Sequence, residues 1–262
     1  MKKLLLVTIS ILTLCWKLYG NTPKININWQ GINHKFIDIA VAPDDGSLLG
    51  VDKSGGYPPY LLFRSTDHGQ NWQQVGNRHA KIYQIAAGQN GMLYYLGGAR
   101  RKMLFWSANA GQTWDWKALG KILEHIAMAP DGTVWGIDPN QKVFYSTDKK
   151  ENWQQVNGLL RKIAVAPDGT LWGIDPDYKV LYSIDSGQSW KQVTGQLNRI
   201  AVAPDGTLWG TNLSHAVFCS TDKGQTWLQV DGILDQIIVA PDGTLWGINP
   251  DGLVFHGTVI KN

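Results

Sequence analysis

The stretch IAVAPDGTLWGI, at residues 163–174, is the phrase from which the fold of this chain is derived. It returns almost unchanged as IAMAPDGTVWGI at 126–137, IAVAPDGTLWGT at 200–211 and IIVAPDGTLWGI at 237–248. Two more divergent copies precede these, IAVAPDDGSLLG at 39–50 and IAAGQNGMLYYL at 85–96. Six copies at a spacing of about 40 residues indicate a repeat architecture, in which each repeat is one structural unit.

A second phrase, S-x-D-x-G-x-x-W, alternates with the first at 65–72, 107–114, 146–153, 183–190 and 220–227. Asn109 replaces the Asp in the second copy, and Lys150 replaces the Gly in the third. Asp side chains at such positions accept backbone N–H bonds within their own turn, so we interpret these boxes as structural and assign no chemistry to them. Their residues are Asp67, Trp72, Trp114, Asp148, Trp153, Asp185, Trp190, Asp222 and Trp227.

Each repeat is predicted to contain four short antiparallel strands. In the fourth repeat they are Arg161–Ala166, Thr170–Ile174, Lys179–Ser183 and Ser189–Val193, which are rich in β-forming residues and bounded by turn signals. No segment has helical periodicity. Six such units, beginning near residues 36, 81, 122, 159, 196 and 233, predict an all-β fold, a six-bladed β-propeller.

The two ends of the chain predict how the ring closes. The sixth repeat ends at Asn262 without a fourth strand, whereas Asn28-Trp29-Gln30 matches the start of outer strands such as Asn152-Trp153-Gln154. We expect residues 25–32 to complete the last blade, because this pairing removes exposed sheet edges.

The first 20 residues are interpreted as a signal peptide that precedes a single domain at residues 21–262. Lys2 and Lys3 stand before a largely apolar run, Leu4 to Trp16, that is too short to span a membrane. Cleavage near Gly20 predicts a secreted or periplasmic protein. Lipidation of Cys15 is an alternative, although Leu14 is larger than a lipoprotein box prefers.

Charge and cysteine content exclude several classes of function. The chain has 24 basic and 21 acidic residues, and three of the basic ones, Lys2, Lys3 and Lys17, lie in the leader. The remainder is therefore neutral, which argues against a nucleic-acid partner. Cys219 is then the only cysteine, so no disulfide framework is expected, and we interpret it as a packed thiol.

The tryptophans of the first phrase have two interpretations. Packing between blades is the one we favour. In the alternative, their indole edges border grooves between blades and stack on a sugar, while a polar residue that recurs after the phrase binds hydroxyls or caps a turn. The candidate carbohydrate-binding residues are Trp135, Trp172, Trp209, Trp246, Asp138, Asp175, Asn212 and Asn249.

An enzymatic function lacks the residues it needs. Phe63-Arg64-Ser65 departs from the Arg-Ile-Pro phrase of a sialidase, and the six histidines are scattered without metal-ligand spacing. We therefore predict no catalytic residue, no metal site and no cofactor.

The two phrases resemble known families. The first, followed by an outer strand with Trp, is similar to the tectonin repeat family, which includes tachylectin-like lectins, and the second is the Asp-box found in sialidases and other propellers. This resemblance implies a non-enzymatic, sugar-binding protein whose partners are glycans on a surface. The alternatives are a protein-interaction scaffold, with a docking point at the basic loop of the second repeat (Gly97 to Lys102), and a sialidase-like glycosidase or lyase.

Overall fold

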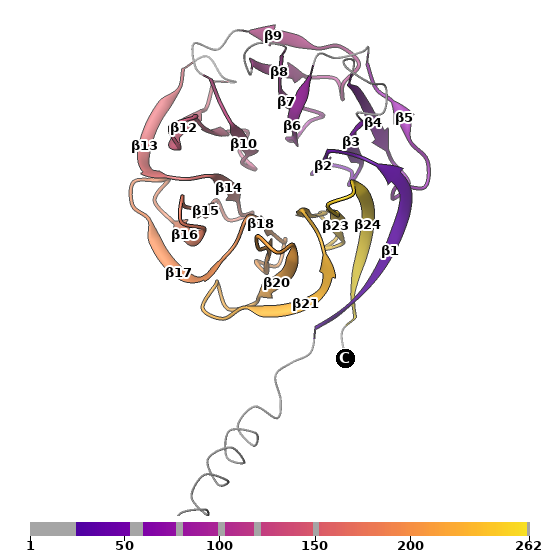
Figure 1. Cartoon of the computed structure of the whole chain (residues 1–262). Coiled ribbons are helices and arrows are strands. Elements are labelled where there is room, and N and C mark those ends of the chain that lie inside the picture. Colours follow the sequence, from indigo (N-terminus) through magenta and orange to yellow (C-terminus); the bar gives the residue numbers. More distant parts are fainter. Residues whose placement is uncertain are drawn as a thin grey trace, which may run out of the picture.

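Six four-stranded antiparallel sheets are arranged in a ring in the computed structural model of the chain (Figure 1). The structure describes residues 25–52, 60–76, 81–98, 103–117, 122–148 and 152–260. The predicted signal peptide, with Cys15, lies outside these residues, as do Lys150 and residues 99–102 of the basic loop. Among the described residues, no helix is long and apolar enough to cross a membrane.

In the first three blades, the strands run from the innermost to the outermost in chain order. Blade one comprises β2 (Asp38–Val41), β3 (Leu48–Asp52), β4 (Leu61–Ser65) and β5 (Gln73–Gln74). Blade two comprises β6 (Ile82–Ala87), β7 (Leu93–Gly97), β8 (Met103–Ser107) and β9 (Asp115–Lys117). Blade three comprises β10 (His125–Met128), β11 (Val134–Ile137), β12 (Lys142–Ser146) and β13 (Gln154–Leu159).

Blades four and five repeat this order, and blade six takes its outer strand from the other end of the chain. Blade four comprises β14 (Lys162–Val165), β15 (Leu171–Ile174), β16 (Lys179–Ser183) and β17 (Lys191–Gln196). Blade five comprises β18 (Arg199–Val202), β19 (Leu208–Thr211), β20 (Ala216–Ser220) and β21 (Leu228–Ile233). Blade six comprises β22 (Gln236–Val239), β23 (Leu245–Ile248), β24 (Leu253–Ile260) and β1 (Asn26–Lys35).

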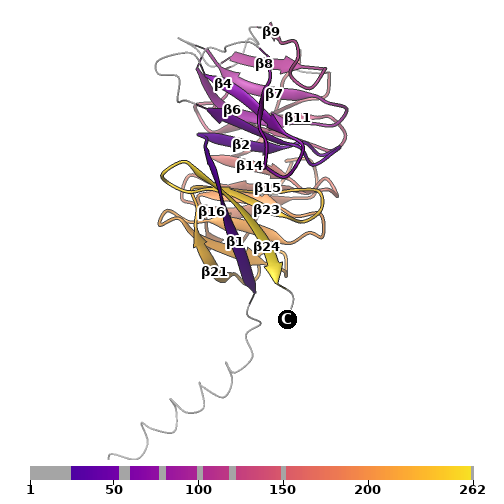
Figure 2. The ribbon, with the colours of Figure 1, turned by 90° about the vertical axis from the view of Figure 1, so that its right-hand side faces the viewer.

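The N-terminal strand closes the ring, as the sequence predicts. β1 pairs antiparallel with β24 from Asn26 opposite Ile260 to Lys35 opposite Leu253, with an irregularity between Ile32 and Lys35. Figures 1 and 2 show the two strands side by side at the edge of the disc. The six-bladed propeller is thus confirmed, and no blade is left with an unpaired outer strand position.

In the fourth repeat, the third strand has the predicted bounds, the first two agree with the prediction to within one residue at their ends, and the outer strand is shifted. β17 begins at Lys191 rather than Ser189 and continues to Gln196. The backbone N–H of Ser189 donates instead to Asp185 Oδ1 at 2.9 Å, so this residue belongs to the Asp-box turn.

The hydrophobic core lies between blades rather than inside any one of them. One cluster joins Trp135 and Val143 of blade three to Ile163 and Leu171 of blade four, and equivalent clusters occur at the other junctions. A residue on either face of a blade is therefore buried, which explains why the second strands, such as β15, are buried at every position except Asp52 at the end of β3. Close approach also restricts this strand, because a Cβ added at Gly173 would lie 2.6 Å from Leu160 Cδ1.

Candidate functional site

The tryptophans of the first phrase are packed inside the blade junctions. Trp135, Trp172, Trp209 and Trp246 are between 1% and 5% exposed. Trp172 lies with its ring centre 5.3 Å from that of Tyr182, its cross-strand partner. This burial supports the packing interpretation and leaves no open ring face on which a sugar stacks.

The polar residues that follow the phrase lie at the other end of the second strand from the tryptophans. Trp172 stands near the start of β15, whereas Asp175 follows its last residue. Asp175 Oδ1 accepts the backbone N–H groups of Asp177 and Lys179, both at 2.8 Å. The same turn-capping bonds are made by Asp138, Asn212 and Asn249. The structure therefore does not bring the predicted tryptophans and polar residues together in one site.

The Asp-box residues form the turns that the sequence predicts. In the first box, Asp67 Oδ1 accepts the backbone N–H of Asn71 at 2.9 Å and the hydroxyl of Ser65 at 2.7 Å. These bonds, with the Asn71 backbone N–H contributing most, lower the pKa of Asp67 to about 2. The boxes of Asp185 and Asp222 repeat this pattern, and hydrogen bonds from Ser189 and Thr226 lower their pKa values to about 2 as well. All three carboxylates serve their own hairpins.

In two places, an Asp-box hairpin also covers the motif tryptophan of the preceding blade. A Cβ added at Gly224, in the box of blade five, would lie 3.6 Å from Trp172 in blade four. Gly69, in the box of blade one, has the same relation to Trp246 in blade six, at 3.4 Å. Blade six is completed by the two chain ends and has no Asp-box hairpin, so Trp209 of blade five lacks this cover, and neighbouring strands alone keep it 3% exposed.

A groove of about 730 Å³ lies at that position, between blades five and six. We call it the closure groove. Its polar wall consists of Asp205, Thr207, Thr221, Asp242, Thr244 and Thr258, and its apolar wall of Ile25, Ala203, Pro204, Trp209, Pro241, Val259 and Ile260. Polar and apolar side chains thus line the same cavity, and this combination is a general feature of small-molecule sites.

The carboxylates of the closure groove are held by their turns. Asp205 Oδ1 accepts the backbone N–H of Thr207 at 2.9 Å, and Asp242 Oδ1 accepts that of Thr244 at 2.8 Å. Desolvation opposes ionisation of Asp242, but the hydrogen bonds from Thr244 and the nearby His68 outweigh it and lower its pKa. Both side chains are solvent-exposed, so the groove presents fixed negative acceptors to a ligand.

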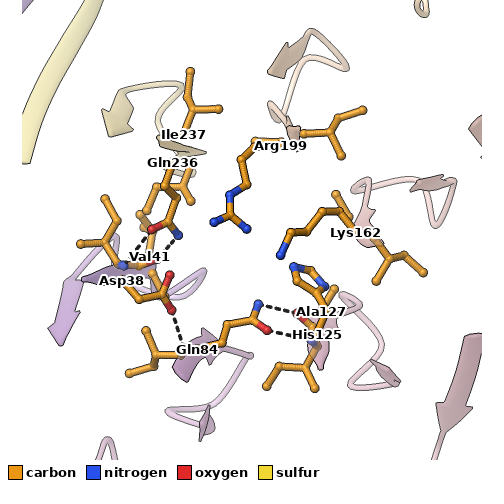
Figure 3. Close-up of a pocket in the computed structure, with 18 of the residues that line it drawn as sticks. Asp38, Val41, Gln84, His125, Ala127, Lys162, Arg199, Gln236 and Ile237 are labelled. Atoms are coloured by element: carbon orange, nitrogen blue, oxygen red, sulfur yellow. Dashed lines mark hydrogen bonds between the residues drawn. The ribbon is translucent and has the colours of Figure 1, made fainter. Parts of the chain in front are cut away.

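A second cavity, of about 370 Å³, lies on the propeller axis at the opposite end of the blades from the closure groove. The innermost strands begin there, and each contributes one polar side chain (Figure 3). We call this cavity the channel mouth, and the six polar residues at equivalent positions of the innermost strands are Asp38, Gln84, His125, Lys162, Arg199 and Gln236.

Sequence reasoning did not identify the channel mouth, although a signal for it exists. Lys162 and Arg199 stand directly before the I-A-V-A-P-D-G phrase, and five different residue types occupy this position in the six repeats. When one position varies beside an otherwise constant phrase, packing does not determine the type of residue at that position.

Two buried titratable groups of the channel mouth, Asp38 and His125, have shifted pKa values. Burial raises the pKa of Asp38 to about 6, against a hydrogen bond from the Ile85 backbone and the charges of Arg199 and Lys162, which lower it. Burial also holds the pKa of His125 well below its usual value, and the same two cations add to this shift. The imidazole is therefore neutral at pH 7.

Cys219 has a structural role, as the sequence predicts. Cys219 is 2% exposed, and burial raises its pKa to about 11, so its thiol stays protonated and packed. Among the described residues, no three His, Cys, Asp or Glu side chains are grouped so that they could hold a metal ion.

Comparison with known proteins places this fold in a family. The profile of the Tectonin domain matches residues 81–262, and that of the BNR/Asp-box repeat matches residues 63–74. No curated protein matches the sequence.

Similar solved structures have different activities. The structure of YCF48 bound to D1 peptide has a TM-score of 0.63 at 17% identity and covers 92% of this chain and 99% of that one. XC5397 from Xanthomonas campestris, a gluconolactonase, has a TM-score of 0.69 at 14% identity and covers 93% of each chain. A streptogramin B lyase has a TM-score of 0.61 at 10% identity and covers 90% of this chain and 98% of that one. At these identities the likeness shows the propeller fold alone.

Proposed function

Because this chain belongs to the Tectonin domain family, we propose that it is an exported, non-enzymatic propeller that binds glycans on a surface. Export is inferred from residues 1–20, with two lysines before a short apolar run. The neutral charge of the remaining chain is compatible with a neutral ligand.

The closure groove is the observation that carries this proposal. Its volume of about 730 Å³ accommodates one or two sugar rings, and its walls offer both kinds of contact that a sugar needs. The carboxylates of Asp205 and Asp242 accept hydrogen bonds from hydroxyl groups, and the four threonines both donate and accept. Pro204, Pro241 and Val259 offer apolar surface to the C–H face of a ring.

This assignment changes the expected number of sites. The sequence predicts several similar sites at the motif tryptophans, but Trp172 and Trp246 are covered by the neighbouring Asp-box hairpins. We therefore propose the open groove beside Trp209 as the principal site. Avidity on a glycan surface then requires several copies of the protein rather than several sites on one ring.

A glycan array tests the proposal, with the purified protein carrying Asp205→Asn and Asp242→Asn together. Asn keeps the Oδ1 acceptor that caps each turn but replaces the second carboxylate oxygen with a donor. We expect array binding to weaken by about 10-fold or more, because hydrogen bonds to charged groups are worth about 1.5–3 kcal/mol.

The matched control is Asp168→Asn, at the equivalent turn of blade four, where the Thr170 backbone N–H is capped in the same way. It should leave binding unchanged. Equal losses in both variants, or no glycan bound by the wild type, would contradict the proposal. In the latter case, a stable protein partner recovered by pull-down would favour the interaction scaffold.

A further inference from the structure

We propose that the channel mouth is a second binding site, for a small hydroxylated monocarboxylate held by Arg199 and Lys162. This site lies on the propeller axis, at the other end of the blades from the closure groove, and the inference does not depend on glycan binding there.

Three of the six side chains at the channel mouth are used to join neighbouring blades. Gln84 bridges blade two to blade three, since its Oε1 accepts the Ile126 N–H at 2.9 Å and its Nε2 donates to the Ile126 carbonyl at 2.9 Å. Gln236 bridges to Ile39 in the same way, at 3.3 and 3.0 Å. Asp38 accepts the Ile85 N–H at 2.6 Å. These contacts give the three residues a structural role.

The other three side chains, His125, Lys162 and Arg199, come from consecutive blades and do not make this bridge. Figure 3 shows all three pointing into the channel from one side of the ring, with Asp38 on the opposite side. They gather two cationic groups and one neutral imidazole around the same part of the cavity.

Backbone donors reinforce this side of the channel mouth. In blade four, Ala166 pairs with Thr170 by a backbone hydrogen bond, so the alternation of antiparallel pairing turns the N–H of Ile163 away from β15 and towards the axis. At Ile163, Ile200 and Ile237, no side-chain acceptor among the described residues takes the N–H that the bridges take elsewhere. A ligand with acceptor oxygens is the natural partner for such donors.

The geometry of Arg199 suits a carboxylate. Its Nε donates to the Asp235 carbonyl at 3.3 Å, and a terminal nitrogen lies 3.8 Å from Asp235 Oδ2. This anchoring holds the guanidinium in place at the channel wall, and a planar guanidinium binds a carboxylate with two parallel hydrogen bonds. The buried Nδ1 of His125 has no hydrogen-bond partner among the described residues, so it adds a polar group that a ligand would satisfy.

The carboxylates beside the two cations disfavour a ligand with more than one negative charge, and the volume limits its size. Asp38 and Glu124 line the same cavity as Lys162 and Arg199, so a doubly charged phosphate would be repelled more strongly than a carboxylate. A volume of about 370 Å³ admits a ligand of about the size of one sugar acid. Its hydroxyls would meet the unpaired inner edges of the strands.

Calorimetric titration at pH 7.5 and low salt tests the proposal with D-glucuronate as the probe. D-glucose and inorganic phosphate serve as the uncharged and doubly charged comparisons. We expect saturable binding of glucuronate, no binding of glucose and at least 10-fold weaker binding of phosphate. Arg199→Gln and Lys162→Gln should each weaken glucuronate binding about 10-fold or more.

Two further variants keep the test independent of folding. Arg161→Gln is the matched control, because Arg161 adjoins Lys162 but is exposed and lies over the Tyr178 ring at 4.4 Å, outside the cavity wall. It should leave binding unchanged. Asp38→Asn removes the opposing charge while keeping an acceptor for Ile85, so it should tighten binding, a result that misfolding does not produce.

The proposal is overturned if glucuronate does not bind, if phosphate binds as tightly, or if the Arg199 and Lys162 variants bind like the wild type. Loss of glucuronate binding in the Asp205→Asn, Asp242→Asn protein would also overturn it, because that result would move the ligand to the closure groove.

Discussion

The two repeated phrases place tryptophan in different surroundings. Trp172, in the first phrase, is 5% exposed and enclosed by the next blade, whereas Trp190, in an Asp-box, is partly exposed and donates to the Asn157 carbonyl at 2.9 Å. Truncation of the first leaves a cavity inside a junction, and truncation of the second opens a surface that water can fill.

We therefore expect Trp172→Ala to lower the free energy of unfolding by about 3–5 kcal/mol, the range for emptying a buried aromatic site. Trp190→Ala should lower it by less. Chemical denaturation of both variants measures the difference. A larger loss at Trp190 would contradict the packing described for the first phrase.

Asp38 makes the stability of the ring depend on pH. Its pKa is about 6 in the folded protein and 3.8 in an unfolded chain, so the folded state binds the proton more tightly. The stabilisation is fully present below pH 4 and is lost as the pH rises through 6. The groups that face this carboxyl are Gln236, Lys162, Arg199 and His125.

Asp38→Asn removes this titration and keeps the acceptor for the Ile85 N–H. The variant should be more stable than the wild type at pH 8, by up to about 3 kcal/mol from the two-unit shift, and similar to it at pH 4. Melting temperatures across this pH range test the prediction. Parallel curves for the two proteins would show that Asp38 is not the group responsible.

At the scale of elements, the Asp-box tryptophans of blades four and five, Trp190 and Trp227, connect their hairpins to the outer strand of the preceding blade. Trp227 Nε1 donates to the Thr194 carbonyl at 2.9 Å, and Trp29 of β1 makes the same bond to Asp231 at 2.7 Å. In both places the indole lies over the glycine that follows the acceptor residue in the chain. These glycines, Gly195 and Gly232, have a positive φ. β1 thus supplies both the missing strand and the missing tryptophan contact of the last blade.

Gly195→Ala tests this contact, and Gly206→Ala is the matched control. Both glycines have positive φ, at +95° and +83°, but a Cβ at position 195 would lie 2.7 Å from Trp227 Nε1, whereas nothing lies within 4 Å of one at 206. Both variants carry backbone strain. Gly195→Ala should be less stable by about a further 1–3 kcal/mol, because overpacking adds to that strain. An equal decrease in the free energy of unfolding of both variants would show that the indole moves aside without an energetic cost.

At the scale of the whole molecule, ring closure depends on one strand. β1 is the only described partner of the outer edge of β24, and Ile27 is buried in the junction between blades five and six. Without β1, an unpaired strand edge and an apolar face meet solvent, a combination that promotes association.

A chain that begins at Lys35 should therefore aggregate or unfold, whereas one that begins at residue 21 should keep the stability of the ring. Size-exclusion chromatography and thermal melting compare the two. A monomeric truncated chain with an unchanged melting temperature would refute closure by β1.

The sequence by itself determined the number of blades, the strands of each blade and the strand that closes the ring. This information is local, because the apolar alternation of Lys179–Ser183 and the turn at Pro167-Asp168-Gly169 act within one hairpin. The match of Asn28-Trp29-Gln30 to the other outer strands likewise predicted which strand closes the ring.

The functional surfaces were decided by tertiary structure. Trp172 is buried because the next blade packs over it, including an Asp-box about 50 residues later in the chain, and the closure groove lies where blade six lacks that hairpin. At the channel mouth, the sequence marks Arg199 and Lys162 only as residues at a variable position before a repeated phrase. Only the ring brings six side chains, each about 40 residues from the next, around one axis. The neighbouring blade then decides which of them are used as bridges and which face the cavity.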